Sequence, residues 1–235
     1  MDTGDAAGVI VVAAGESRRM TGMDKIFTPL LKQPLITYSL SVINDSPHVS
    51  FIVLVLAPGS LERGRRLMRS NRWAKLIDVC AGGERRQDSV RLGLERLPQC
   101  DWVIVHDGAR PLLNGETIAS GLEAARSTGA AVSAVPVKDT IKMVDAHGVV
   151  TRTVERDRLW AVQTPQVFRR QLLADAHRSI TLDVTDDASM AELIGVSVKV
   201  FMGSYDNLKV TTPDDLVVAR SILSDRRRVA QGDGR

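Results

Sequence analysis

A loop of small and basic residues follows the first apolar run of the chain. It contains Ala13, Ala14, Gly15, Arg19 and Lys25. Small residues let the backbone approach a phosphate closely, and the cations offer charge-assisted hydrogen bonds to its oxygens. The loop has neither the Walker pattern nor the dinucleotide-binding glycine fingerprint. It therefore predicts a phosphate-binding loop of another kind, with an ordinary strand-to-helix turn as the alternative.

A second candidate loop runs from Gly82 to Ser89 and begins with two glycines. The glycines would admit close contact with a flat base or a ribose. Ser89 could hydrogen-bond a base, or it could cap the helix that follows. The segment thus predicts part of a nucleotide pocket, with a simple glycine turn before a helix as the alternative.

A third loop begins at His106-Asp107, at the end of another apolar run, and includes Arg110. A carboxylate at a strand terminus beside phosphate-binding loops is well placed to hold Mg²⁺, so Asp107 is the candidate metal ligand. His106 receives no role, because a lone histidine is more often packed or hydrogen-bonded than catalytic. Lys209 adds a cation after the last predicted strand, so four such loops are expected on one rim.

The elements that would position these loops alternate along the chain. Apolar runs predict strands at Val9–Ala14, Phe51–Leu56, Leu76–Val79, Trp102–Val105, Ala131–Val135 and Val198–Phe201. Helical spacing predicts helices at Leu35–Ile43, Leu61–Met68, Ser89–Leu97, Thr117–Ala125, Gln171–Arg178, Ala188–Ile194 and from Pro213 to about Leu223. This alternation predicts an α/β sheet, in which ligands bind beyond the carboxyl ends of the strands.

One segment breaks the alternation of strands and helices. Val137–Val154 alternates polar and apolar residues on both sides of an Asp-Ala-His-Gly turn, which predicts a β-hairpin. A hairpin of this length needs something to pack against, and a second subunit is a reasonable candidate. We expect one domain over residues 1–235, a protruding hairpin arm over 137–156, and a disordered tail over 226–235.

Bulk composition limits the class of protein. The chain has 235 residues, of which 44% are hydrophobic and 25% charged, as in an ordinary globular protein. A net charge of +3 permits an anionic small substrate but is low for nucleic-acid binding, and no apolar run is long enough to span a membrane. Cys80 and Cys100 fit no metal or redox spacing, so we expect a reducing, cytoplasmic setting.

Several motifs together carry a family resemblance from about Val9 to Leu223. They are A-A-G-x-x-R-R-M with a following Lys, G-G-x-x-R-x-D-S-V, V-H-D-x-A-R-P, V-K-D-T-I-K, T-V-E-R, Q-T-P-Q, T-D-D-A-S and N-L-K-V-T. With these motifs in this order, the chain resembles the 2-C-methyl-D-erythritol 4-phosphate cytidylyltransferases of the non-mevalonate isoprenoid pathway. The resemblance implies a Rossmann-like, mostly parallel sheet flanked by helices, a homodimer joined through the hairpin arm, and a Mg²⁺-dependent reaction with CTP.

The resemblance also assigns roles to individual residues. Ala13, Ala14 and Gly15 match the triphosphate loop, and the phosphate-neutralising catalytic cations match Arg19, Lys25 and Lys209. The cytosine and ribose pocket matches Gly82, Glu84 and Ser89, with Asp107 beside the nucleotide and the metal. Positions around the erythritol phosphate match Arg110, Thr140, Arg156 and Thr164. Of these, Thr140 and Arg156 are expected to come from the arm of the partner subunit.

Two positions depart from the family pattern. Asp24 stands where proline usually precedes the lysine, in a loop one residue shorter than expected, which affects the placement of Lys25. Glu84 replaces a commoner aspartate and lengthens that side chain. Two alternatives stay open, namely a ribitol 5-phosphate cytidylyltransferase and an inactive nucleotide-binding regulator on the same fold.

Overall fold

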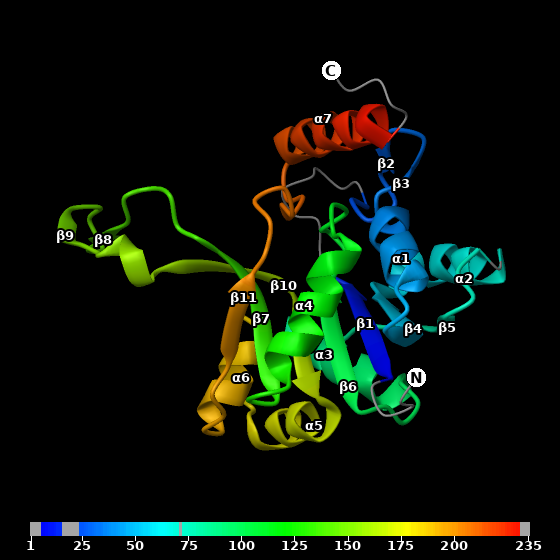
Figure 1. Ribbon diagram of the computed structural model, residues 1–235, viewed down its shortest axis with the longest axis horizontal. Helices are drawn as coiled ribbons and strands as arrows, with labels where there is room; N and C mark the ends of the chain where they lie inside the picture. Colours follow the sequence, from blue (N-terminus) through cyan, green and yellow to red (C-terminus); the bar gives the residue numbers. More distant parts are fainter. Residues whose placement is uncertain (1–5, 16–23, 71, 231–235) are drawn as a thin grey trace.

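The structure is a computed structural model that describes residues 6–15, 24–70 and 72–230. Its centre is a seven-stranded sheet in the order β11-β7-β10-β6-β1-β4-β5 (Figure 1). The strands are β1 (Ala7–Ala13), β4 (Val49–Leu56), β5 (Leu76–Ala81), β6 (Trp102–Asp107), β7 (Ala130–Pro136), β10 (Trp160–Arg169) and β11 (Lys199–Met202). All the pairings are parallel except those of β10, which is antiparallel to both β6 and β7. The predicted Rossmann-like α/β class is confirmed.

Helices cover both faces of this sheet. One face carries α1 (Ile36–Asp45), α2 (Leu61–Arg69) and α4 (Gly115–Ala125), and the other carries α3 (Arg86–Arg96), α5 (Arg170–Ser179) and α6 (Asp187–Leu193). Residues of β1 alternate between these layers, because successive strand side chains point to opposite faces. Val9 and Val11 enter one core while Ile10 and Val12 enter the other. Burial on both faces explains why these strands are continuous apolar runs.

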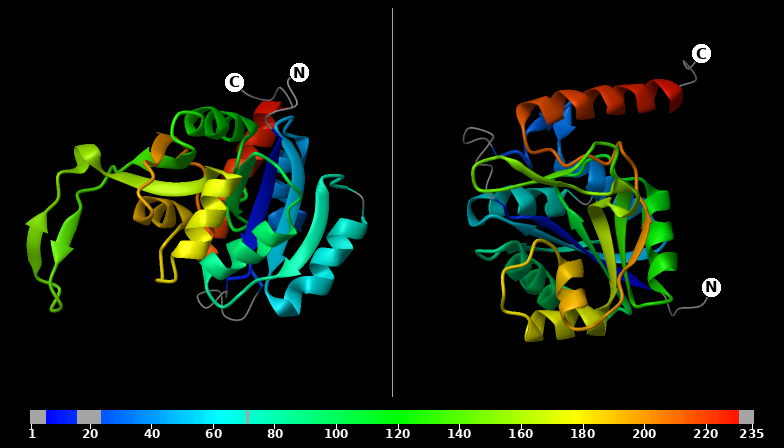
Figure 2. Two further views of the ribbon diagram at one scale, coloured as in Figure 1. Left: turned by 90° about the horizontal axis from the view of Figure 1, so that it is seen from below. Right: turned by 90° about the vertical axis from the view of Figure 1, so that its left-hand side faces the viewer.

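The last helix, α7 (Pro213–Ala230), lies outside these two layers (Figures 1 and 2). Its Ala219 and Leu223 pack with Leu30 and Leu35, at the small β2 (Pro29–Leu30) and β3 (Gln33–Pro34) hairpin, in a third apolar cluster. Our expectation of a disordered tail from residue 226 was wrong for residues 226–230, which are helical. Residues 231–235 lie outside the described residues. No helix in the described ranges is long and apolar enough to cross a bilayer.

Two elements differ from what the sequence led us to expect. The antiparallel strand β10 was not predicted, although it lies in the middle of the sheet. Helix α3 begins at Arg86, not at Ser89, because Asp88 accepts a hydrogen bond from the backbone of Arg85 and closes a capping box there. Ser89 is thus inside the helix and does not cap it.

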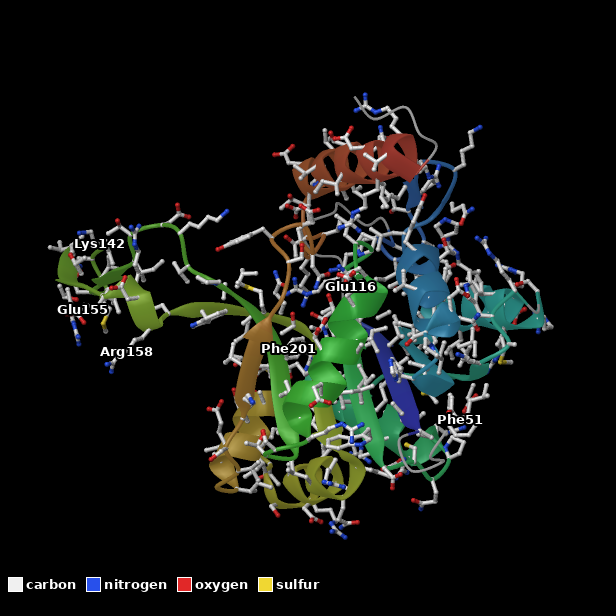
Figure 3. The ribbon with its side chains drawn as sticks, viewed as in Figure 1. Phe51, Glu116, Lys142, Glu155, Arg158 and Phe201 are labelled. Carbon is white, nitrogen blue, oxygen red and sulfur yellow. The ribbon has the colours of Figure 1, made fainter. Side chains whose placement is uncertain are left out.

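The arm projects away from the sheet on the side of β7 and β10 (Figure 1). It consists of β8 (Lys142–Val144), β9 (Val150–Thr153) and the short 3-10 turn η3 (Arg156–Arg158). Strands β8 and β9 pair antiparallel as the hairpin prediction requires. Figure 3 labels Lys142, Glu155 and Arg158 on this arm, set apart from Phe201 on β11 and Glu116 on α4. In this view (Figure 1) none of the helices that the structure describes covers the arm.

Candidate functional site

Parallel pairing brings four strand ends to one edge of the sheet. Val12 of β1 pairs with Asp107 of β6, and Ala13 pairs with Leu56 of β4, which in turn pairs with Ala81 of β5. The loops that leave these strands must therefore meet. The candidate site was predicted at this edge, because ligands of such sheets bind beyond the carboxyl ends of the strands.

A pocket of about 660 Å³ opens among these loops. Its wall includes the predicted nucleotide residues Ala13, Ala14, Gly15, Lys25, Glu84, Ser89, Asp107 and Lys209, together with Ala57, Pro58 and Arg86. The volume lies within the range of small-molecule and cofactor sites. Arg19 lies outside the described residues. Of the predicted nucleotide-binding and catalytic residues that the structure describes, Gly82 alone does not line this wall.

Gly82 instead allows the loop to pack tightly behind the pocket. A Cβ atom at this position would come within 2.3 Å of the Ala14 Cβ and 2.6 Å of the Ser89 Oγ. The Ser89 hydroxyl accepts a hydrogen bond from the Gly83 backbone N–H at 3.1 Å and donates to the Arg85 carbonyl at 3.2 Å. Gly82 and Ser89 thus fix the position of the glycine loop against Ala14.

Asp107 lies at the centre of a cluster of cations. Its carboxylate is 2.8 Å from the Lys209 Nζ, 3.3 Å from the Arg86 Nε and 3.8 Å from the Arg110 Nε. Burial by itself would raise the pKa of Asp107, but the charge of Arg86, followed by those of Lys209 and Arg110, holds it well below the usual range. Asp107 is therefore an ionised carboxylate that faces three cations.

Arg86 connects Asp107 to a second, fully buried carboxylate. Its Nη1 donates to the Asp187 Oδ2 at 2.6 Å, and the other oxygen of Asp187 lies 3.5 Å from the His177 Nε2. Burial would raise the pKa of Asp187, and the charge of Arg86 outweighs it, so that pKa is lowered. Neither Arg86 nor Asp187 was recognised as a site residue from the sequence. Both lie inside quoted motifs, G-G-x-x-R-x-D-S-V and T-D-D-A-S, which was the available signal.

His106 is a neutral structural residue that helps to orient Asp107. Burial lowers the pKa of His106 to about 4. Its Nε2 is 3.1 Å from the Arg110 carbonyl, which can only accept, so Nε2 carries the proton. The Nδ1 then accepts from the Thr164 hydroxyl at 3.2 Å, and the same hydroxyl accepts from the Asp107 backbone N–H at 3.0 Å. The Thr164 proton would have to turn away from His106 to reach a phosphate.

A smaller pocket of about 220 Å³ adjoins the first. Its wall includes the predicted acceptor residues Arg110 and Thr164. Arg86, Asp107 and Lys209 line both pockets. The two cavities therefore meet at the charged cluster, an arrangement that suits two substrates reacting with each other.

The two remaining acceptor residues lie on the arm and line neither pocket. Thr140 is exposed, and Arg156 is exposed at the start of η3, with its Nη1 donating to the Lys138 carbonyl at 2.6 Å. The structure of one chain thus does not bring Thr140 and Arg156 to the sheet edge.

Asp107 fits a divalent cation only in combination with a bound substrate. No group of three or more His, Cys, Asp or Glu side chains suited to a metal occurs among the described residues. Mg²⁺ is commonly held by one or two carboxylates together with substrate phosphates and water. Asp107 can supply one such ligand, and the phosphates would have to supply others.

A cationic pocket at the carboxyl edge of a mostly parallel sheet flanked by helices defines the class as a nucleotide-binding α/β protein. Comparison with known proteins makes this more specific. The 2-C-methyl-D-erythritol 4-phosphate cytidylyltransferase family matches residues 7–225. The chain belongs to this family.

Relatives and solved structures agree with that assignment. A 2-C-methyl-D-erythritol 4-phosphate cytidylyltransferase of Dehalococcoides mccartyi (strain ATCC BAA-2266 / KCTC 15142 / 195) is 46% identical over 223 residues, covering 95% of this chain and 98% of the relative. One from Alkaliphilus metalliredigens is 43% identical, covering 93% of each chain. The crystal structure of 4-diphosphocytidyl-2C-methyl-D-erythritol synthase from Anaerococcus prevotii superimposes with a TM-score of 0.82 at 27% identity, covering 94% of this chain and 96% of that one.

Proposed function

We propose that the protein transfers CMP from CTP to 2-C-methyl-D-erythritol 4-phosphate, giving 4-diphosphocytidyl-2-C-methyl-D-erythritol and pyrophosphate. Family membership over residues 7–225 supports this reaction and this acceptor. The structural observation that carries the proposal is the sharing of Arg86, Asp107 and Lys209 by two adjacent pockets. A transferase needs such a junction, because the two substrates must react where their sites meet.

The larger pocket is assigned to CTP. Ala14 and Gly15 supply the small residues against which a triphosphate can lie, and Lys25 and Lys209 supply positive charge on the same wall. Glu84 and Ser89 line the part of the wall assigned to the cytidine. Arg19 is assigned to the triphosphate by its place in the loop.

The chemistry calls for positioning and charge neutralisation. A phosphate oxygen of the acceptor attacks the α-phosphorus of CTP, a P–O bond forms, and the bond to the leaving pyrophosphate breaks. A phosphate monoester is already a nucleophile near neutral pH, so no protein base is required. Arg19, Lys25 and Lys209 stabilise the negative charge that spreads over the phosphoryl oxygens in the transition state. Asp107 keeps Lys209 at the junction through a 2.8 Å ion pair, and Arg86 contacts the same carboxylate at 3.3 Å.

Mg²⁺ is the proposed cofactor, held by Asp107 and the substrate phosphates. When bound, the ion would neutralise phosphate charge and orient the triphosphate. The chain's own contribution is the single ionised carboxylate of Asp107, kept charged by the cations around it.

The acceptor phosphate is assigned to the smaller pocket, where Arg110 and Thr164 line the wall. Thr140 and Arg156 would complete it from the arm of a second chain, which makes the protein a homodimer. Apolar side chains that are exposed on the arm support this assembly: Ile141, Met143, Val144, Val149 and Val150. Two free cysteines, Cys80 and Cys100, support a reducing cytoplasmic setting.

The test is pyrophosphate release from CTP with each acceptor in turn. We expect rapid release with 2-C-methyl-D-erythritol 4-phosphate and Mg²⁺, and little with ribitol 5-phosphate. Preference for ribitol 5-phosphate would replace the acceptor and keep the chemistry. CTP binding without release for either acceptor would instead indicate a nucleotide-binding regulator.

A further inference from the structure

Asp24 immediately precedes Lys25, and both oxygens of its side chain have partners. The Oδ2 atom accepts a hydrogen bond from the Ser60 Oγ at 2.5 Å and lies 3.4 Å from the Arg63 Nη1. The Oδ1 atom accepts from the Ile26 backbone N–H at 3.3 Å. Ser60 ends the short 3-10 helix η2 (Pro58–Ser60), and Arg63 lies in α2. Asp24 thus joins two segments that are far apart in the sequence.

Both segments belong to the wall of the larger pocket. Lys25 lines this wall, and so do Ala57 and Pro58, the latter at the start of η2. The contacts of Asp24 therefore connect the lysine segment to a second segment of the same wall.

Lys25 is held on both sides along the chain. Before it, the Asp24 side chain is anchored to Ser60 and Arg63. After it, Ile26 and Phe27 are buried, with 3% and 6% of their surfaces exposed. The Asp24 carbonyl also accepts from the Phe27 backbone N–H and the Thr28 hydroxyl, each at 3.1 Å, which closes a turn around Lys25.

Arg63 strengthens this connection from the α2 side. Its guanidinium lies over the Phe27 ring, with Cζ 4.3 Å from the ring centroid, while Nη1 faces Asp24. Arginine can combine ring stacking with a carboxylate contact because its guanidinium is planar. The exposed fractions of 44% for the Arg63 side chain and 29% for that of Asp24 indicate an ion pair only partly shielded from water.

We propose that Asp24 is a positioning residue for the transfer reaction: its carboxylate anchors the turn of residues 24–28 to Ser60 and Arg63 and thereby fixes Lys25 against the triphosphate. A proline, which the family resemblance led us to expect here, would restrain the backbone covalently through its ring. Asp24 restrains it instead with hydrogen bonds to Ser60 and Ile26 and an ion pair with Arg63. This inference rests on the proposed role of Lys25 in catalysis.

The decisive experiment compares Asp24→Ala, Lys25→Ala and the double variant by steady-state kinetics with CTP. We expect Asp24→Ala to lower kcat by about 10- to 100-fold, since a small misplacement of a catalytic group has an effect of that order. In the double variant the loss should be no greater than in Lys25→Ala alone, because the lysine that Asp24 positions is already gone. A structural role would instead multiply the two losses.

Three further variants sharpen the test. Asp24→Asn keeps one acceptor oxygen, enough for either Ser60 or Ile26, and should recover part of the kcat lost in Asp24→Ala. Ser60→Ala removes the hydroxyl that donates to Asp24 and should also lower kcat, with no further loss when combined with Asp24→Ala. Glu62→Ala, which removes an acid of α2 whose partner is Arg69, is the matched control and should leave kcat unchanged.

The outcomes separate the inference from the proposed function. Wild-type kcat in Asp24→Ala, or multiplied losses in the double variant, would overturn the positioning role while Lys25→Ala remained impaired. Wild-type kcat in Lys25→Ala would overturn the catalytic role of Lys25 and the inference with it.

Discussion

The carboxyl edge of the sheet and the hairpin arm differ in how their polar and apolar groups are paired. At the sheet edge, Asp107 is 6% exposed and its carboxylate faces three cations. On the arm, Met143, Val144 and Val150 are each more than half exposed. A region with satisfied, buried charges can form a site within one chain. A region with exposed apolar side chains and candidate ligand residues needs a surface from elsewhere, which is why we assign the arm to a second chain.

The largest effect is expected at the sheet edge, from Asp107→Asn. This change leaves the positive cluster without its carboxylate, so kcat should fall by about 10²- to 10³-fold. The free energy of unfolding should fall by about 3 kcal/mol, because one partner of a buried ion pair is lost. Pyrophosphate release and urea unfolding measure the two effects. Asp175→Asn, which breaks an exposed pair with Arg178, is the control and should change neither.

On the arm, Arg156→Ala and Thr140→Val should act on the acceptor alone. Each removes a donor assigned to the acceptor phosphate, so the KM for 2-C-methyl-D-erythritol 4-phosphate should rise by about 10- to 100-fold, with little change in the KM for CTP. Stability should stay the same, since both residues are exposed. Steady-state kinetics with each substrate varied in turn would separate the effects. A rise confined to the KM for CTP would remove the arm from the acceptor site.

Acid should destabilise the sheet edge through His106. Its folded pKa of about 4 lies below the unfolded value near 6.5, so the unfolded chain binds a proton first as pH falls. The contribution of neutral His106 to the free energy of unfolding is then fully present above pH 6.5. About 3 kcal/mol of it is lost as the pH falls from about 6.5 to 4. The lowered pKa values of Asp107 and Asp187 add their loss below about pH 4. Urea unfolding measured across this pH range should show the loss of stability between pH 6.5 and 4 in the wild type and not in His106→Gln.

The smallest effects are expected from two glycines, one in each region. Gly82→Ala forces a Cβ against Ala14 and Ser89, so we expect a loss of about 1–3 kcal/mol and a higher KM for CTP. Gly148, at the tip of the arm, has open space around it but a φ of +79°. Gly148→Ala should therefore cost about 1 kcal/mol through backbone strain alone and leave the KM for CTP unchanged. If Gly82→Ala and Gly148→Ala changed the KM for CTP equally, the assignment of the nucleotide pocket to the sheet edge alone would be contradicted.

Strands could be predicted from the sequence where their residue pattern directly reflects their burial in the fold. Strands β1, β4 and β6 are continuous apolar runs because helices cover both faces, so they were predictable. Strand β10 was not, because it carries Gln163, Thr164 and Gln166 among its apolar residues. These side chains bond to neighbouring loops, as when the Gln163 amide donates to the Ser204 carbonyl and the Gln166 amide to the Asp186 carboxylate. Only the fold reveals those partners.

Contacts between residues that are far apart in the sequence could not be predicted either. Arg86 and Asp187 are 101 positions apart, and no local spacing links them. The Arg226 side chain suggested a polar tail, yet it donates to the Leu112 carbonyl at 3.1 Å and faces Asp206 at 3.2 Å, which ties α7 to the domain. The glycine and Asp107 loops were placed correctly because parallel strands must bring their ends to one edge.

The most direct test of the composite site mixes two defective chains. Lys25→Ala disables the pocket of its own chain, and Arg156→Ala disables the arm. The mixture is assayed at an acceptor concentration far below the raised KM of the Arg156→Ala variant for the acceptor. Random reassembly makes half the dimers mixed, and one of the two sites in each mixed dimer then combines an intact pocket with an intact arm. We predict recovery of roughly a quarter of the wild-type activity. Activity that stays at the sum of the two separate variants would show that the pocket and the arm of different chains do not form one site.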